Sequence, residues 1–233
     1  MTTALFIFIF IAITLIFILK KDKKNNQNNT ISHFFNLDDG NQKDLLIAAE
    51  ISQDWLNEVK SKYNWDNFDQ YDNRMWEYMY KLFDDMVANH GIEDHKELWF
   101  KLNRSQKVFW AFLAFNGDTN NGGVYQFMFN KTAHIFSTLE MWQELGMDDI
   151  AKDYEAVLHE FTGKVDTIAG IKATFNNEAN SWDKRFTAFA EGYKELTTAQ
   201  KIESYYYKEE FTKYSHKKVS DYIEQHIAMF VKA

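Results

Sequence analysis

Apolar residues recur along most of this chain at intervals of three and four positions, which places them on one face of an α-helix. The stretches with this spacing are Leu45–Val59, Met75–Met86, Val108–Phe115, Ile135–Trp142, Ile150–Phe161, Trp182–Tyr193 and Val219–Phe230. No convincing run of alternating strand residues bounded by hairpin signals interrupts them. Short connections between the stretches indicate antiparallel neighbours. The sequence therefore predicts an all-α, antiparallel multi-helix domain whose methionine and aromatic stripes form the core.

Glycines and small polar residues predict where several of these helices begin and end. Ser105 is expected to cap the helix that follows it, and Asn116-Gly117 is expected to end that helix. Gly146 is expected to close the next helix, and Asp148 to cap the one after it.

The first nineteen residues carry no charged side chain. As a helix they would be roughly 28 Å long, close to the ~30 Å hydrocarbon core of a bilayer. A cleaved signal peptide is one alternative, but its basic residues should precede the apolar run, whereas here the lysines at 20, 21, 23 and 24 follow it. A buried strand of this length would be rare. The sequence predicts a transmembrane anchor at residues 1–19, with the lysines and the soluble part of the chain facing the cytoplasm.

Composition divides the rest of the chain into two parts. Residues 20–40 are basic and then polar, which is typical of a flexible tether. Residues 41–233 carry the helical stripes and are expected to form one helical domain.

Charge and residue usage exclude several function classes. The chain has no cysteine, which excludes disulfides, thiolate zinc sites and cysteine nucleophiles. Its formal net charge of −8 argues against direct binding of nucleic acid. The acidity is concentrated in residues 36–100, which hold 15 acidic and 6 basic side chains.

The stretch Asn116–Asn130, NGDTNNGGVYQFMFN, has the composition of a ligand loop but fails the tests for one. A phosphate loop needs Lys and then Ser or Thr after its second glycine, and Gly123 and Val124 stand there instead. A calcium loop needs oxygen ligands at its fifth and twelfth positions, and these fall on Gly122 and Phe129. We therefore interpret the stretch as a scaffold.

In that interpretation each group of residues has a structural task. Gly117 ends a helix, and Gly122-Gly123 allow a positive φ where the chain reverses. Asp118, Asn120 and Asn121 bond to nearby backbone amides, as in Asx turns. Aromatic residues after the glycines return to the core, and Gln126 and Asn130 connect the turn to the next segment.

The same stretch resembles the helical DNA-mimic protein 19-like family, which is catalogued as a domain of unknown function. The resemblance includes the preceding RSQKVFWAFLAF, the following TLEMWQELGMDDIAKDYEAVLHEF and the later YIEQHIAMF, and it extends over about residues 75–231. The positions that carry the family motif are Gly117, Asp118, Asn120, Asn121, Gly122, Gly123, Gln126, Phe127 and Asn130. This chain departs from the family in its apolar N-terminus and in having no proline between the later helices. The resemblance implies a non-catalytic protein whose acidic surface imitates DNA and occupies DNA-binding proteins.

A row of carboxylates could supply such an acidic face. The candidates are Asp66, Asp69, Asp72, Glu77, Asp84 and Asp85. On a helix, the three-residue spacing of the first three keeps them roughly on one side. The alternative is an ordinary solvated helix face.

Other polar clusters have simpler interpretations. His90, Glu93, Asp94 and His95 lie close in sequence, but their spacing is not that of a zinc-binding helix, so a solvated loop is favoured. His159-Glu160 at a helix end is interpreted as compensation of the helix dipole. Tyr205-Tyr206-Tyr207 is interpreted as core or interface rather than as a base-stacking site. We predict no catalytic residue, cofactor or metal ion.

Two function classes remain open from the sequence. The first is a membrane-tethered protein-binding module, a possible homodimer, with a DNA-binding protein as its partner. The second is a hydrolase that uses the Asn/Gly-rich stretch with His134 or His90. A hydrolase should show a cleft in which Asp118, Gln126 and a histidine converge.

Overall fold

The computed structural model describes residues 34–40, 52–63, 67–87, 95–161 and 196–231. Within these ranges the chain forms helices and no strand. The α-helices are α2 (Gln53–Ser61), α3 (Phe68–Val87), α4 (His95–Lys101), α5 (Arg104–Asn130), α6 (Ile135–Glu144), α7 (Asp148–Phe161), α10 (Thr197–Tyr206) and α11 (Glu209–Gln225), and the 3₁₀ turns are Thr132–His134 and Ile227–Met229. The predicted all-α class is confirmed.

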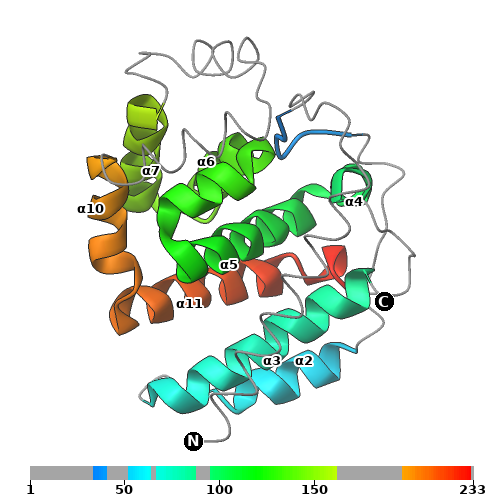
Figure 1. The fold of residues 1–233 in the computed structure, drawn as a ribbon. Coiled ribbons are helices and arrows are strands. Elements are labelled where there is room, and N and C mark those ends of the chain that lie inside the picture. Colours follow the sequence, from blue (N-terminus) through cyan, green and yellow to red (C-terminus); the bar gives the residue numbers. More distant parts are fainter. Residues whose placement is uncertain (1–33, 41–51, 64–66, 88–94, 162–195, 232–233) are drawn as a thin grey trace, which may run out of the picture.

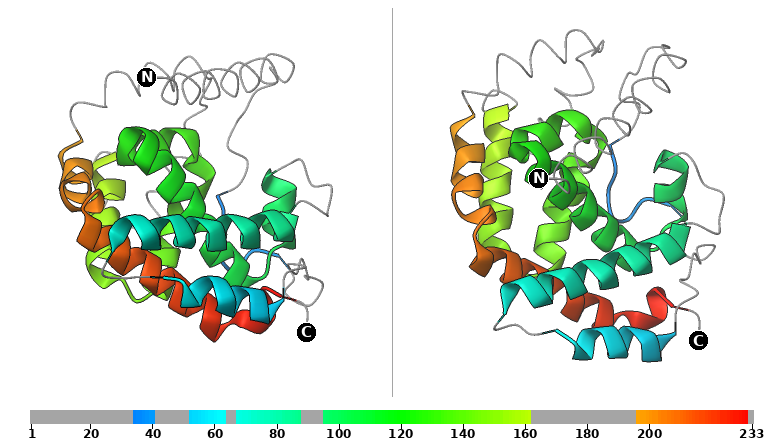
Figure 2. Two further views of the ribbon diagram at one scale, coloured as in Figure 1. Left: turned by 90° about the horizontal axis from the view of Figure 1, so that it is seen from below. Right: turned by 60° about the horizontal axis from the view of Figure 1, so that its bottom comes forward.

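Helix α5 runs through the middle of the molecule (Figure 1). It packs against α6 on one side and against α11 on the other, while α7 and α10 lie together at one end. Helix α3 lies beside both α2 and α11, as the view from below also shows (Figure 2). Several helices that follow one another in the chain pack against each other, namely α2 with α3, α5 with α6, α6 with α7 and α10 with α11.

The core of this arrangement is aromatic, and Phe115 of α5 lies at its centre. Its ring is 5.4 Å from Trp142 of α6, 5.7 Å from Tyr154 of α7 and 5.4 Å from Tyr206 of α10, all with edge-to-face geometry. Phe127, on the far side of the glycines, lies 4.9 Å from the same ring. Four segments therefore meet on one side chain, and such aromatic pairs contribute beyond their buried area.

The predicted helix boundaries are correct in part. Gly146 closes α6 at a φ of +63°, and the Gly146 and Met147 amides donate to the carbonyls of Gln143 and Trp142, as in a Schellman motif. The predicted Ser105 cap is wrong, because Asn103 caps α5 in a reciprocal capping box with Gln106. Asp148 is the first residue of α7 and places its charge in the first turn.

The prediction that a helix ends at Asn116-Gly117 is also wrong. Helix α5 continues through both residues to Asn130 and is kinked at Gly122 and Gly123. The residues on both sides of Gly117 are helical, and this context and the capping described below outweigh the local preference of glycine for a helix end.

Two helices, α4 and α10, were not predicted from the apolar spacing. Both are short, with seven and ten residues, so each carries too few apolar positions for a clear period. The stretch Trp182–Tyr193 and the first part of Leu45–Val59 lie outside the described residues.

Residues 34–40, assigned above to the end of a tether, pack on the helical core. Phe34, Phe35 and Leu37 are buried, and Phe35 stacks on Trp99 of α4 at 5.0 Å. The Phe35 amide donates to the carbonyl of Ala133 at 2.8 Å. Their apolar side chains make this segment part of the fold.

The predicted single-pass membrane localisation is contradicted. In the part of the chain that the structure describes, no helix combines the length and the apolar character that crossing a bilayer requires. Even α5, with 27 residues, carries Arg104, Lys107 and Asp118. Helix α5 packs against α6, α10 and α11. Residues 1–19, on which the prediction rested, lie outside the described residues.

Candidate functional site

The Asn/Gly-rich stretch is a kink within α5. Gly122 is extended at a φ of −164°, whereas Gly123 has a φ of +86°, which favours glycine. The second part of the helix begins at Val124, whose amide donates to Oε1 of Glu203 on α10 at 2.8 Å. A carboxylate from another helix thus caps the restart of α5.

Both glycines also lie close to the ends of polar side chains. A Cβ at Gly123 would overlap the carboxylate of Glu203, and a Cβ at Gly122 would overlap the side chain of Gln126. Gly117 differs, because it is helical and a Cβ there would meet nothing within 4 Å. Gly122 and Gly123 therefore form the kink, and Gly117 is not needed for it.

The polar residues of the Asn/Gly-rich stretch bond to each other and to α10. Asn130 donates to Asp118 Oδ1 at 2.8 Å across the kink. Asn116 Oδ1 accepts from Asn120 at 3.0 Å and from the hydroxyl of Tyr206 at 2.7 Å. These contacts join the two parts of α5 and fix α10 against them.

This geometry leaves the stretch without the features of a ligand loop. The carboxylate of Glu203 already occupies the start of the second helical part, where a phosphate would bind. His134 is buried and packs 4.7 Å from Phe35 and 5.1 Å from Trp99. Asp118, which the hydrolase hypothesis places in a cleft, accepts instead from Asn130, and His90 lies outside the described residues.

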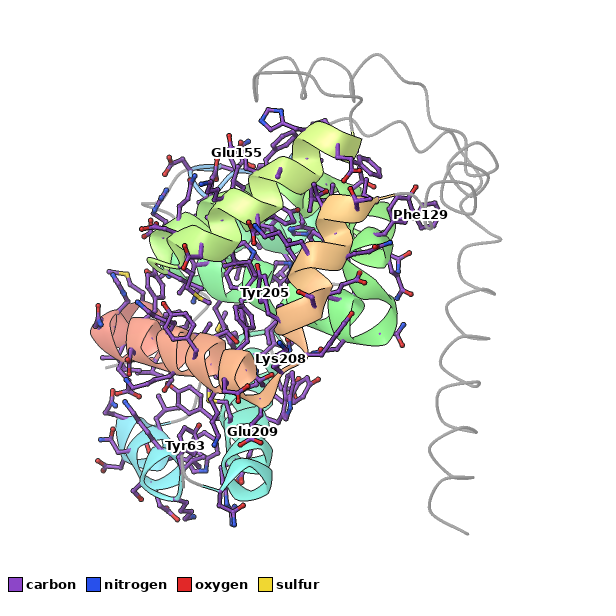
Figure 3. All side chains as sticks on the ribbon, turned by 90° about the vertical axis from the view of Figure 1, so that its left-hand side faces the viewer. Tyr63, Phe129, Glu155, Tyr205, Lys208 and Glu209 are labelled. Carbon is purple, nitrogen blue, oxygen red and sulfur yellow. The ribbon has the colours of Figure 1, made fainter. Side chains whose placement is uncertain are left out.

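A pocket of about 640 Å³ lies elsewhere, between the start of α7 and the junction of α10 with α11. Figure 3 faces these three helices and shows Tyr205 near the end of α10, with Lys208 and Glu209 at the junction. The lining residues are Gly146, Met147, Asp148, Asp149, Ile150, Asp153, Tyr205, Lys208, Glu210, Phe211 and Tyr214. None of the motif positions is among them.

The pocket combines aromatic walls with carboxylates. Asp153 accepts from Lys201 at 2.6 Å and from the Tyr205 hydroxyl at 3.3 Å. Burial raises the pKa of Tyr205, and the charge of Asp153 raises this pKa further, so the phenol stays neutral and donates. Asp148, Asp149 and Glu210 are exposed.

A family model described as DMP19-like protein matches residues 100–226. The chain belongs to the DMP19-like protein family. The matched residues make up more than half of the 233 and include the kink, Glu203 and the pocket. They begin later than the residue 75 expected above. No curated protein and no solved structure matches the chain.

The candidate acidic face lies upstream of the DMP19-like region. Asp69 and Asp72 belong to the first turns of α3, and Asp66 lies outside the described residues. Two further candidates pair with bases on the same helix: Glu77 with Arg74 at 2.8 Å and Asp85 with Lys81 at 2.5 Å. The remaining candidate, Asp84, is exposed.

The histidine cluster considered for a metal lies largely outside the described residues, which contain only His95, the first residue of α4. Elsewhere in the described ranges, no three His, Asp or Glu side chains are placed to hold a metal ion. The DMP19-like family is not a known enzyme family.

The sequence did not reveal Glu203 or the pocket. Glu203 is 79 residues from the amide that it caps, and no local pattern indicates so distant a contact. A signal for the pocket was present, because Phe211 and Tyr214 share one face of a helix whose first turn is acidic.

Proposed function

We propose that this chain is a non-catalytic protein-binding module whose acidic surface takes the place of DNA on a basic DNA-binding partner. The proposal rests on one observation in the DMP19-like region: the residues that hold the kink and the exposed acidic residues are different residues. Asn130 of the family motif and Glu203 of α10 stabilise the kink of α5, whereas exposed carboxylates lie on other helices.

The net charge supports a basic partner. With a formal charge of −8, the chain attracts basic proteins and repels nucleic acid. DNA presents one charge per roughly 1.7 Å of its axis, so a mimic needs carboxylates in rows. The row of Asp66, Asp69 and Asp72 is one candidate surface, and the pocket on α7 and α11 is another.

Competition with DNA tests this function. The purified full-length chain is immobilised and exposed to proteins of the source cell that salt has eluted from duplex DNA. We expect retained proteins to be displaced by added duplex DNA and released as salt rises, because screening weakens exposed charge pairs. A retained protein that still binds duplex DNA while bound to this chain would contradict mimicry.

Charge variants then test the surface. Neutralising Asp66, Asp69 and Asp72 to Asn should weaken capture without lowering thermal stability, if this row contacts the partner. Unchanged capture would assign the row to an ordinary solvated face.

A further inference from the structure

We propose that the pocket between α7, α10 and α11 binds an arginine side chain of a basic protein partner. The proposal rests on the proposed function of protein binding and names the part of the partner that is recognised. It concerns residues inside the DMP19-like region but outside the family motif.

Aromatic rings of α10 and α11 line this pocket. The rings of Tyr205 and Phe211 pack with their centroids 5.1 Å apart, and Tyr214 is 47% exposed. An exposed tyrosine beside a cavity offers a ring face to a planar cation. The ring of Tyr214 already attracts a cation within the chain, since Lys218 Nζ lies 5.6 Å from its centroid.

Carboxylates of α7 and α11 also line the pocket. Four acidic residues line the pocket against one lysine, Lys208. Asp153 is paired with Lys201. The other three acids make no ion pair with another described residue, so their charge is available to a ligand; they are Asp148, Asp149 and Glu210.

This combination fits a guanidinium better than other ligands. An anion would meet four carboxylates. A metal ion would need three ligands within reach of one point, and no such group occurs in the described ranges. A guanidinium stacks on aromatic rings with its face and donates to carboxylates with its edge, whereas an ammonium is a compact, strongly hydrated charge.

The test measures peptide binding to the full-length chain by fluorescence anisotropy. Three labelled peptides share a Gly/Ser background and carry two arginines, two lysines or two citrullines, which are neutral and have nearly the shape of arginine. We expect the arginine peptide to bind on the order of tenfold more tightly than the citrulline peptide, and more tightly than the lysine peptide. Equal binding of the arginine and citrulline peptides, or no binding at millimolar peptide, would overturn the proposal.

Variants then locate the binding. Glu210→Gln and Tyr214→Leu should each weaken binding of the arginine peptide by about two- to fivefold, since each removes one exposed contact. Tyr214→Phe keeps the ring and should bind as the wild type does. Asp54→Asn is the matched control, because it removes an exposed carboxylate from the first turn of α2. An equal loss in Asp54→Asn and Glu210→Gln would mean that net charge, and not the pocket, attracts the peptide.

The outcomes separate this proposal from the proposed function. If a DNA-competing partner is captured equally by the wild type and by Tyr214→Leu, the pocket assignment is wrong and mimicry stands. If the arginine peptide binds in the pocket but captured proteins keep their DNA, the pocket stands and mimicry is wrong.

Discussion

Gly117 and Gly123 belong to one helix and meet opposite local conditions. Gly123 has a φ of +86° and lies against the carboxylate of Glu203, whereas Gly117 is helical with open space around its Cα. A side chain at position 123 is disfavoured by its backbone angle and by the capping contact, and a methyl group at 117 would meet neither obstacle.

Replacement of these two glycines by alanine should therefore have opposite effects. We expect Gly123→Ala to lower the free energy of unfolding by roughly 1–2 kcal/mol or more. Gly117→Ala should raise it by about 0.5–1 kcal/mol, because alanine favours the helix. Urea unfolding followed by tryptophan fluorescence measures both. A Gly123→Ala variant of wild-type stability that no longer captures a partner would show that the kink is a binding site rather than a scaffold.

A buried histidine gives the protein a predicted pH dependence. His216 of α11 packs edge to face against Trp76 at 5.6 Å and Phe112 at 6.0 Å. Burial lowers the pKa of His216 to about 4, from 6.5. Between these two pH values the unfolded chain binds a proton that the folded chain does not, so stability falls as the pH falls.

We expect the free energy of unfolding to be about 2 kcal/mol lower at pH 5 than at pH 7 on account of this group. His216→Leu should remove most of that difference. The measurement is urea unfolding of both proteins at the two pH values. Equal pH dependence in the two proteins would contradict the assignment to His216.

At the scale of helices, carboxylates from one helix cap the start of another. Glu203 of α10 caps the restart of α5, and Glu160 of α7 accepts from the amides of Thr197 and Thr198 at the start of α10. The sequence indicates dipole compensation by His159-Glu160, and the structure adds the bonds of Glu160 to α10. The helices α5, α7 and α10 are therefore joined by capping as well as by their aromatic core.

Loss of the Glu160 carboxylate, which caps α10, should destabilise the start of α10 before other parts of the fold. Glu160→Ala leaves the Thr197 and Thr198 amides without their carboxylate and should cost about 1–2 kcal/mol. Hydrogen exchange should accelerate most in the first turn of α10. Glu155→Ala is the control on the same helix, because among the described residues Glu155 pairs only with His159, at 3.9 Å. Equal effects of the two variants would contradict the capping role.

At the scale of the whole molecule, the segment 34–40 completes a core that the family-matched region does not complete alone. Asp39 accepts from Trp99 Nε1 at 3.1 Å, and its carbonyl accepts from the ammonium of Lys107. Lys107 is fully buried, and burial lowers its pKa. The segment supplies the partners that make this burial tolerable.

Replacing one buried side chain of residues 34–40 tests whether this segment stabilises the core. Phe35 is 5% exposed and stacks on Trp99, so Phe35→Ala should lower the free energy of unfolding by about 3 kcal/mol or more. Asp38→Asn in the same segment removes an exposed charge that pairs with Arg104 and should cost less than about 1 kcal/mol. A change of less than 1 kcal/mol for Phe35→Ala, judged by thermal and urea unfolding, would show that the core does not depend on the segment.

The sequence by itself determined the helical class, most of the long helices, the glycine that ends α6 and the family. These follow from short-range spacing, and Gly146 has the same local task in any helical context. Tertiary structure decided that the Asn/Gly-rich stretch is a kink and not a helix end, because Glu203 caps Val124 across 79 residues. It also decided the pocket, where α7 and α11 bring acidic and aromatic residues together. Residues that are distant in sequence meet only through packing, and no local period records such a meeting.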